Sequence, residues 1–483
     1  MFETKLIVNG TAVDATSTRV FERESAMGDG VATISAAADH TDAHTAATAA
    51  AAAFPAWSQS PDSTRASVLN TAADILLSRS DDVCAAMARE TGATARWARF
   101  NCRVAAGMLR HAAKMATFQR QMTRTGYDAD VESVLIRQPV GVVLGIAPWN
   151  APIVLATRAL AVPLAVGNTT VLKASDRCPK THSLVVEALI EAGIPAGVVN
   201  LVTHAPDSAT DIVEALVAHP AIRRVNFTGS TRVGRNIAVT CAQHLKPVVL
   251  ELSGKAALIV LEDADIARAV RAALHGAFFN QGQVCLSTER IVVNHRVADE
   301  FVDALVHEVK SVRVGTPDSE DTQFGPLISA DAALRVQRLV EDAVDKGATL
   351  LAGGTVTKST MAPSILDNVN ASMRIYREES FGPVASIVRV GSEDEAVTVA
   401  NDTEYGLTAA VHSRDIDRAM HVARQLDCGV CQINGSTVYD DANMPFGGMK
   451  ASGYGKLSGE ESITEFTELR WVAVHRSDRS MHL

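Results

Sequence analysis

The chain has 483 residues, of which 47% are hydrophobic and 21% are charged, and its formal net charge is −10. At roughly 150 residues per domain this length predicts two to four domains, and the lack of a basic stripe argues against a nucleic-acid partner. MFETKLIVNG at the N-terminus lacks the basic and apolar regions of a signal peptide. The longest apolar run, from Val142, is interrupted by Pro148, Pro152 and Pro163, so we expect no membrane span.

Seven cysteines are scattered along the chain, an odd number that favours free thiols in a reducing cytoplasm over a disulfide framework. We therefore expect a cytoplasmic protein. Cys428 and Cys431 have the spacing of a redox pair, but they lie in the apolar run CGVCQIN. A redox pair begins a helix, whereas this run favours a strand, so we expect two strand cysteines without redox function.

The alanine-rich stretch HTAATAAAAAFPAWSQS, which begins at His40, is typical of a helix, and we expect it on the surface. Two other stretches, DADVESVLIRQPV and FTELRWVAV, alternate in the manner of strands and stand apart from the rest of the pattern. Exposed strands of this kind commonly pair with another edge, which indicates an oligomer.

From Gly141 to Glu251 short β-branched runs recur, beginning near residues 141, 169, 198, 223 and 247. A helical stretch rich in alanine and leucine follows each turn, and the spacing of about 25 residues leaves room for one crossover helix. This pattern predicts a parallel, helix-covered α/β sheet of the doubly wound type. A second region with a similar rhythm runs from ELSGK to about residue 434 and predicts a second α/β domain.

Distinctive residues follow the strands of the first predicted sheet. They are Trp149 with Asn150, Lys173, Gly229 with Ser230, and Glu251. Ligands bind beyond the carboxyl ends of parallel strands, where loops and helix N-termini converge. Each residue alone could be an ordinary cap or turn residue, but together they indicate a binding site. The stretch GSTRVG, between a strand and a helix, is a candidate for holding a pyrophosphate.

Cys285, in the polar turn NQGQVCLSTER, has the access that a nucleophilic thiol needs. Asn150 could donate to the oxyanion formed on a carbonyl carbon, and Glu251 could act as a general base. The alternative is that Cys285 is a small apolar filler and that the other two side chains are structural. Spacing alone does not decide between these interpretations.

Seven motifs then occur in a fixed order over nearly the whole chain: GIAPWN, FTGSTRVG, ELSGK, NQGQVC, EESFGPV, YGLTAAV and MPFGGMKASGYGK. The chain resembles the aldehyde dehydrogenase superfamily, and most of all its bacterial members that act on benzaldehyde, salicylaldehyde or vanillin. The resemblance implies a Rossmann-type NAD(P)-binding domain, an α/β catalytic domain, a small β oligomerisation flap and a homodimer or homotetramer. The implied ranges are 1–124 and 141–251 with 435–465 packing back for the cofactor domain, 252–434 for the catalytic domain, and 125–140 and 466–483 for the flap.

By this resemblance Cys285 attacks the aldehyde carbon to give a thiohemiacetal, and loss of hydride to the nicotinamide leaves a thioester. Asn150 and the backbone N–H of Cys285 hold the oxyanion, and Glu251 activates the water that hydrolyses the thioester. The resemblance implies no metal. In ELSGK, Ser253 stands where the family usually has glycine, so we expect an ordinary backbone conformation there.

The same resemblance implies a set of cofactor contacts. They are Lys173 and Asp176 at the adenosine ribose, Gly229, Ser230 and Gly234 at the pyrophosphate, Glu379 and Phe381 at the nicotinamide ribose, Trp149 and Thr228 beside the nicotinamide, and Ile146 and Leu252. An acid near the ribose favours NAD, because it bonds the 2′-hydroxyl and repels a 2′-phosphate. Aspartate is shorter than the usual glutamate, however, and Arg177 follows it, so NADP stays open.

For the substrate, an aromatic aldehyde is expected, and a short aliphatic semialdehyde is the alternative. Arg158 is a candidate to bond a phenolic or carboxylate substituent, or else forms an ion pair on a helix surface. Trp97 either walls the substrate tunnel or belongs to the core, and Tyr439 is a third candidate contact. A protein of the same fold that binds without turnover is the alternative from a different functional class.

Overall fold

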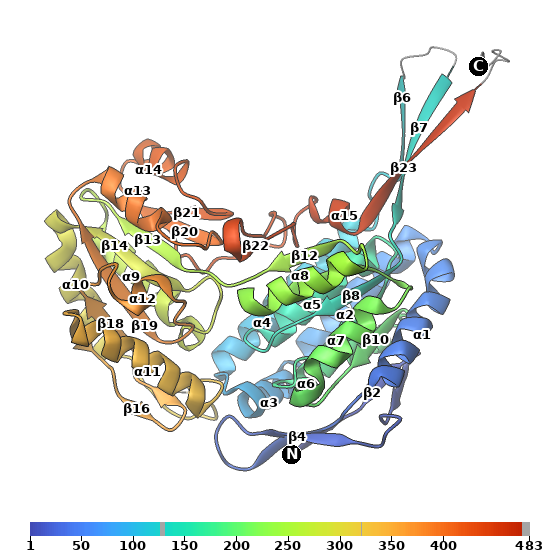
Figure 1. Ribbon diagram of the computed structural model, residues 1–483, viewed down its shortest axis with the longest axis horizontal. Helices are drawn as coiled ribbons and strands as arrows, with labels where there is room; N and C mark the ends of the chain where they lie inside the picture. The colour runs from blue at the N-terminus through green and yellow to red at the C-terminus, as the bar shows by residue number, and fades with distance from the viewer. Residues whose placement is uncertain (126–130, 320, 476–483) are drawn as a thin grey trace.

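The computed structural model describes residues 1–125, 131–319 and 321–475. Two lobes lie side by side, each a largely parallel sheet covered by helices, and a narrow three-stranded sheet projects from one of them (Figure 1). The chain passes from the first lobe to the second across Leu252 to Lys255, since β12 ends at Glu251 and β13 begins at Ala256. The mixture of helices and parallel sheets is the α/β fold expected from the sequence.

The first lobe has an eight-stranded sheet in the order β22-β12-β11-β8-β9-β10-β2-β3. Its five central strands are parallel and begin within a residue or two of the predicted positions. β8, β9 and β10 are buried along their whole length, as continuous apolar runs in a covered parallel sheet should be. The strands are β2 (Leu6–Val8), β3 (Thr11–Val13), β8 (Val142–Ile146), β9 (Thr169–Lys173), β10 (Val199–Val202), β11 (Ile222–Thr228), β12 (Val248–Glu251) and β22 (Gly453–Tyr454).

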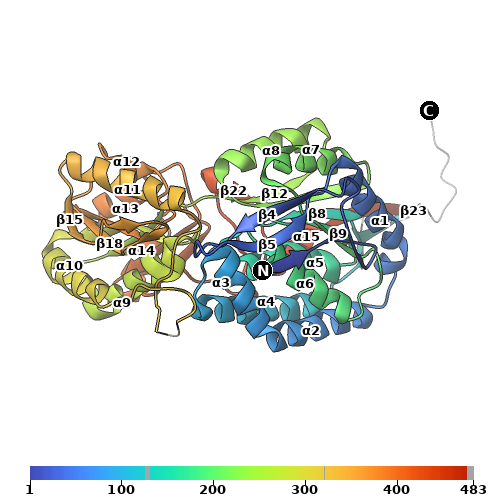
Figure 2. The same ribbon diagram turned by 90° about the horizontal axis from the view of Figure 1, so that it is seen from below.

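Helices cover both faces of this sheet, with α1, α7 and α8 on one face and α2 to α6 on the other (Figure 2). The alanine-rich stretch forms α1, as predicted, but it is only half a surface helix because one face of alanines packs on the sheet. α5 is buried all round, since it lies between the sheet and α4. The helices are α1 (His40–Ser58), α2 (Asp62–Ser78), α3 (Ser80–Thr91), α4 (Ala95–Met115), α5 (Pro152–Ala165), α6 (Pro179–Glu191), α7 (Ala209–Ala218), α8 (Thr231–Gln243) and α15 (Ser462–Glu465), with 3-10 turns η1 (Pro206–Ser208) and η3 (Lys450–Ser452).

The second lobe has a seven-stranded sheet in the order β15-β18-β19-β14-β13-β20-β21, parallel except for β15. The strands are β13 (Ala256–Val260), β14 (Thr288–Asn294), β15 (Thr349–Ala352), β18 (Ser364–Asp367), β19 (Val384–Val390), β20 (Thr408–His412) and β21 (Val430–Ile433). The helices are α9 (Ile266–Phe278), η2 (Phe279–Gly282), α10 (His295–Lys310), α11 (Ala330–Asp345), α12 (Arg374–Arg377), α13 (Glu393–Asn401) and α14 (Ile416–Ala423). Two small sheets complete the described chain: β1 (Phe2–Thr4), β4 (Val20–Glu24) and β5 (Val31–Ala36), and the pair β16 (Val356–Thr357) and β17 (Thr360–Met361).

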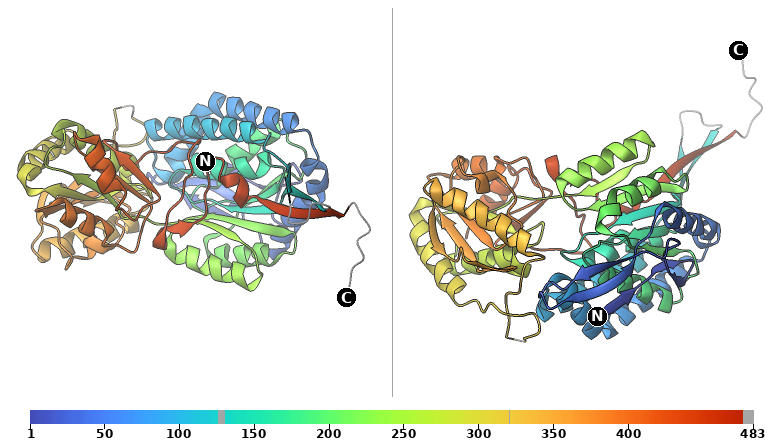
Figure 3. Two further views of the ribbon diagram at one scale, coloured as in Figure 1. Left: turned by 90° about the horizontal axis from the view of Figure 1, so that it is seen from above. Right: turned by 60° about the horizontal axis from the view of Figure 1, so that its bottom comes forward.

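The projecting sheet consists of β6 (Gln121–Thr125), β7 (Val131–Pro139) and β23 (Thr467–His475), and β23 extends away from the first lobe in both views of Figure 3. The two alternating stretches of the sequence are therefore partners of each other, paired antiparallel from Thr467 opposite Pro139 to His475 opposite Val131. β6 begins at Gln121, before the predicted boundary of the flap at residue 125. The sequence interpretation missed this strand because QMTRT is polar and lacks an apolar alternation. Residues 126–130 and 476–483 of the predicted flap lie outside the described residues. The functional roles of these ranges stay predictions.

All seven cysteines are free, and Cys431 lies in β21 with Cys428 just before that strand. Neither thiol begins a helix, in line with the sequence interpretation. Over the described ranges of the chain, no helix combines the length and the apolar character needed to cross a membrane.

Candidate active site

The carboxyl ends of the central strands of the first sheet bring the predicted residues to one edge. Thr228 pairs with Glu251 between β11 and β12, and Phe227 pairs with Ile146 between β11 and β8. Ile146 in turn pairs with Lys173 of β9, so these strand ends stand in register. The expected convergence is therefore confirmed in the backbone.

Cys285 belongs to the second lobe and lies at this edge, shortly after a turn with left-handed backbone. Asn280 and Gln281 have φ of 49° and 56°, and Gly282 follows with φ of 69°, so three successive residues are left-handed. A Cβ on Gly282 would lie 2.2 Å from the carbonyl oxygen of Gly382, which leaves room only for glycine. Such backbone persists only where its surroundings hold it in place, and here the turn fixes the position of the thiol.

Hydrogen bonds anchor this turn to Asn150, the residue that follows PW at the end of β8. The Asn280 side chain and the Trp97 indole each donate to the backbone carbonyl of Asn150, both at 3.0 Å. The Asn150 side-chain amide donates to the carbonyl of Gln283 at 3.0 Å. An amide has two N–H donors, so the second one is available to an oxyanion beside Cys285.

Two cavities share Cys285 and Asn150 in their walls, so the thiol lies where they meet. The first, which we call the polar cavity, has a volume of about 280 Å³ and is lined by residues that include Trp149, Thr228, Ser230, Glu251, Glu379 and Phe381. The second, the aromatic cavity, has about 270 Å³ and is lined by residues that include Trp97, Phe100, Val154, Leu155, Arg158, Tyr439, Asp440 and Phe446. A partly exposed nucleophile between two chambers can meet one ligand from each side.

Glu251 is 1% exposed, and neither of its carboxylate oxygens has a hydrogen-bond partner among the described residues. Burial raises the pKa of Glu251 to about 7, and the cation of Arg158 opposes that rise. Burial, together with the negative charge of Glu251, also raises the pKa of Cys285 well above its ordinary value. The resting thiol is therefore protonated at neutral pH, and the adjacent carboxyl has the pKa of a general base that works near pH 7.

The polar cavity suits the cofactor that the motifs imply. Ser230 caps the N-terminus of α8 by accepting a bond from the Val233 N–H, which places the free amides of that helix at the cavity. A Cβ on Gly234 would lie 2.4 Å from the Leu252 side chain, so this glycine lets α8 pack closely against the residue that follows β12. The cradle for an anionic group is thus built into the strand-to-helix turn.

The opposite wall of the polar cavity carries Glu379 and Phe381. The Glu379 carboxylate accepts a bond of 3.1 Å from the Gly254 N–H, and burial raises its pKa to about 7. The Phe381 ring meets Trp149 edge-on at 5.8 Å between centroids. Ser253, on the near wall, has no positive φ, as expected from the sequence.

Lys173 and Asp176 lie farther along the same sheet edge and line neither of the two cavities. Lys173 ends β9, and burial lowers its pKa to about 8 although Asp176 opposes that effect. Arg177 lies 3.5 Å from the Asp176 carboxylate. Their roles at an adenosine ribose stay predictions.

The aromatic cavity contains all three predicted substrate residues. Trp97 is both a wall of this cavity and a buried tryptophan, packed edge-on against Phe279 at 4.7 Å. Tyr439 lines the mouth and is 54% exposed. The surface ion pair considered for Arg158 is wrong, because Arg158 is buried on α5 and its partner, Asp440, lies on the loop after β21.

Among the residues of this cavity that the sequence interpretation missed, two contact Arg158. Phe446, inside MPFGGMKASGYGK, lies under the Arg158 guanidinium at 4.3 Å from the ring centroid. Asp440, in VYDDANM, pairs with Arg158, and the two are separated by 282 residues of chain. A buried arginine requires an anionic partner, so the sequence could have indicated that an acid lies near Arg158. It could not have indicated which acid, because the chain contains many.

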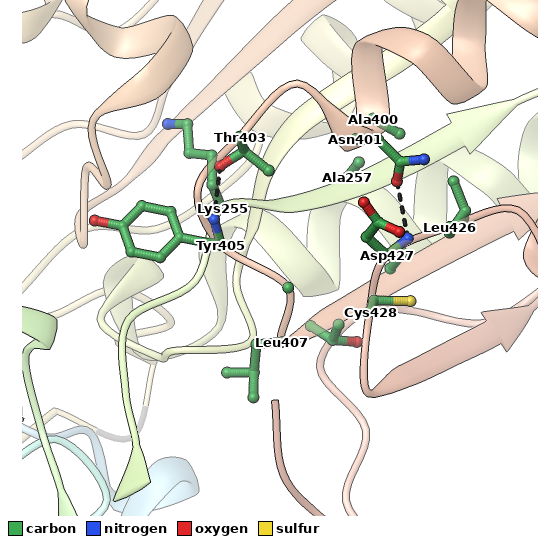
Figure 4. A pocket seen from close by; sticks show the side chains of 13 residues that line it. Lys255, Ala257, Ala400, Asn401, Thr403, Tyr405, Leu407, Leu426, Asp427 and Cys428 are labelled. Carbon is green, nitrogen blue, oxygen red and sulfur yellow. Dashed lines mark hydrogen bonds between the residues drawn. The ribbon is translucent and has the colours of Figure 1, made fainter. Parts of the chain in front are cut away.

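A third cavity, in the second lobe, is drawn in Figure 4. Lys255, Tyr405 and Cys428 are among its lining residues, and the Asp427 N–H donates to Asn401 at its far end. Its volume of about 20 Å³ has room for about one water, so it cannot hold an aldehyde. Within the described residues, no group of three or more His, Cys, Asp or Glu side chains is placed to hold a metal.

Comparison with known proteins decides the family. The sequence profile of the aldehyde dehydrogenase family matches residues 13–472. A vanillin dehydrogenase of Pseudomonas fluorescens is 50% identical over 482 residues, which cover 99% of each chain. The chain belongs to the aldehyde dehydrogenase family. It is thus an oxidoreductase that acts on aldehydes, and the resemblance seen in the seven motifs is confirmed.

Solved structures of other aldehyde dehydrogenases support the same fold. The crystal structure of a salicylaldehyde dehydrogenase from Pseudomonas putida G7, complexed with salicylaldehyde, is 44% identical and superimposes with a TM-score of 0.97 over 99% of both chains. A betaine aldehyde dehydrogenase from Staphylococcus aureus in complex with NAD⁺ is 30% identical, with a TM-score of 0.95 over 99% of this chain and 96% of that one. NAD(P) is the cofactor typical of this family, and the polar cavity fits it.

Proposed function

We propose that this aldehyde dehydrogenase oxidises a hydroxylated aromatic aldehyde to its carboxylic acid, with NAD as the electron acceptor. The observation that carries the proposal is the aromatic cavity, whose apolar walls of Trp97, Phe100 and Phe446 lead to the Cys285 thiol. A planar ring fills such a chamber by apolar contact and edge or face packing. Vanillin and salicylaldehyde, the substrates in the names of two relatives, are both hydroxylated benzaldehydes.

The chemistry follows from the groups around the thiol. The Cys285 thiol loses its proton to water in the cavity, and the thiolate adds to the aldehyde carbon. The oxyanion is held by the free N–H of the Asn150 amide and by the Cys285 backbone N–H. A thiolate is a good nucleophile and a good leaving group, so the covalent route divides one difficult oxidation into two easier steps.

NAD supplies a hydride acceptor when it is bound in the polar cavity. In this proposal Trp149 and Thr228 border the nicotinamide, Glu379 and Phe381 hold its ribose, and the amides at Ser230 hold the pyrophosphate. When the tetrahedral adduct collapses, its C–H bond breaks, the hydrogen leaves as hydride to that acceptor, and a thioester stays on Cys285. Glu251 draws a proton from the water that attacks this thioester, and the acid leaves the enzyme.

Two finer points rest on composition and exposed surface. The free thiols of all seven cysteines support a cytoplasmic location. The projecting sheet exposes Leu469 and Trp471 of β23, and an apolar surface of this kind on an edge sheet supports a homodimer or homotetramer.

A panel of aldehydes with NAD and NADP tests the proposal. We expect kcat/KM for benzaldehyde and its hydroxylated derivatives to exceed that for succinic semialdehyde by about tenfold or more. The reason is that the aliphatic chain leaves unfilled the space that an aromatic ring would occupy. NAD should be favoured, because Arg177 lies beside Asp176 and so is less available to a 2′-phosphate. NAD(P)H formation at 340 nm is the measurement. A higher value for succinic semialdehyde than for every aromatic aldehyde would contradict the substrate class, and no turnover of any aldehyde would favour a binding protein.

A further inference from the structure

The wall of the aromatic cavity contains an ion pair between the buried Arg158 and the largely buried Asp440, in otherwise mostly apolar and aromatic surroundings. An ion pair in such a place costs desolvation free energy, and apolar residues of similar size would often be at least as stable. Stability alone therefore does not explain the pair. Its position in the cavity that the reacting thiol also lines indicates a role in choosing the substrate.

Asp440 is more exposed to the cavity than Arg158 is. The side chain of Asp440 is 14% exposed, whereas that of Arg158 is only 4% exposed. One face of the Arg158 guanidinium is also covered by the Phe446 ring. Both side chains line the cavity, and the carboxylate is the more exposed of the two to a bound aldehyde.

One carboxylate oxygen of Asp440 has no hydrogen-bond donor. Its Oδ2 accepts from Arg158, while Oδ1 is buried and has no partner among the described residues. A buried acceptor without a donor is destabilising, and a ligand that brings a donor to it recovers that free energy. Hydroxyl is the donor that a substituted benzaldehyde carries.

We propose that Asp440 is a specificity-determining residue, which accepts a hydrogen bond from the phenolic hydroxyl of the substrate and repels aldehydes that carry a carboxylate. Arg158 positions this carboxylate and balances its charge. The inference rests on the proposed function, because it concerns the same cavity. It also reverses the sequence expectation, in which Arg158 itself would bond the substituent.

The first test compares hydroxybenzaldehydes with their methyl ethers, at the 2-, 3- and 4-positions. A methoxy group keeps the oxygen but cannot donate, so for at least one position the hydroxy compound should have a kcat/KM about tenfold higher or more. The preference should fall as the pH rises through the pKa of the phenol itself, since a phenolate cannot donate and is repelled by Asp440. Benzaldehyde, measured at each pH, corrects for changes in the catalytic groups.

Asp440→Asn should bring this hydroxy-to-methoxy ratio close to one. The amide oxygen stays with Arg158 and an N–H₂ faces the cavity, where a hydroxyl and a methoxy oxygen accept equally well. The variant also leaves the Arg158 cation unbalanced, so kcat/KM for succinic semialdehyde should rise about tenfold. Asp441→Asn is the matched control, because Asp441 bonds Asn443 and lines neither cavity; its ratios should equal those of the wild type.

Removing one partner of a buried pair can prevent folding, so a double variant is measured alongside. Arg158→Met with Asp440→Leu replaces the pair with apolar side chains, and its hydroxy-to-methoxy ratio should also be close to one. It should show no gain with succinic semialdehyde, because no cation is left. The inference is overturned if the wild-type ratio is near one at every ring position, or if the folded variants keep the wild-type ratio. Failure to oxidise benzaldehyde at all would count instead against the proposed function.

Discussion

Cys285→Ala should abolish aldehyde oxidation, with a loss in kcat of at least about 10³-fold, because Cys285 is the only nucleophilic side chain among the described residues that line both cavities. The steady-state rate of NADH formation with benzaldehyde measures the loss. Mass spectrometry of the wild type, stopped during turnover, should find an acyl group on the peptide that contains Cys285. Retention of NAD-dependent oxidation by the alanine variant would show that the thiol is not the nucleophile.

The matched control is Cys84→Ala, which removes a second partly buried thiol from α3 in the first lobe. Cys84 lines neither cavity, so this variant should keep the wild-type rate. Cofactor binding separates loss of chemistry from loss of structure. Since Cys285 contributes only one side of the polar cavity, Cys285→Ala should still bind NAD, which quenching of protein fluorescence can follow.

Much of the fold could be predicted because its signals are local. The β-branched runs at regular spacing predicted the strands of the first sheet. The carboxyl ends of these strands carry the candidate site residues, and the alignment of neighbouring strands places those residues at one edge. Asn150, Glu251 and Cys285 became candidates because each lies at a strand end or in a polar turn, but their catalytic roles came from the resemblance to the family. β6 was missed because QMTRT has no apolar alternation, and its place in the sheet depends on pairing with β7.

The parts of the site that escaped prediction depend on contacts between distant segments. Asp440 lies far along the chain from Arg158, and nothing local to either residue indicates that they pair. The left-handed turn before Cys285 is equally hidden, because Asn280 and Gln281 are held there by tertiary contacts rather than by their own preference. The direction of a buried side chain is decided by packing, so a motif can name a site residue without showing what it touches.

Glu251→Gln should slow thioester hydrolysis while leaving the first turnover largely intact, because glutamine keeps the shape of the side chain but cannot take a proton from water. The charge of Glu251 is one of the causes that raise the pKa of Cys285, so its removal makes the thiol more acidic and does not block acylation. We expect a burst of about one NADH per active site, followed by a steady rate about 10²–10⁴-fold below that of the wild type. Stopped-flow absorbance resolves the two phases, and a variant with neither a burst nor an acylated Cys285 would show that Glu251 is needed for the first step instead.

The pH dependence of this step follows from the burial of Glu251. A base works when it is deprotonated, and a pKa of about 7 means that the carboxyl is largely protonated at pH 6. Hydrolysis in the wild type should therefore rise with pH through about 7 and then level off, and Glu251→Gln should lose this rise. A midpoint near 4.5, the value of an exposed glutamate, would mean that the carboxyl is hydrated during turnover and that burial does not set its pKa. Arg158 lowers the pKa of Glu251 and Asp440 raises it, and the effect of Arg158 is the larger of the two. Removing both charges in Arg158→Met with Asp440→Leu should therefore move the midpoint above that of the wild type, which connects the ion pair of the aromatic cavity to the base that completes the reaction.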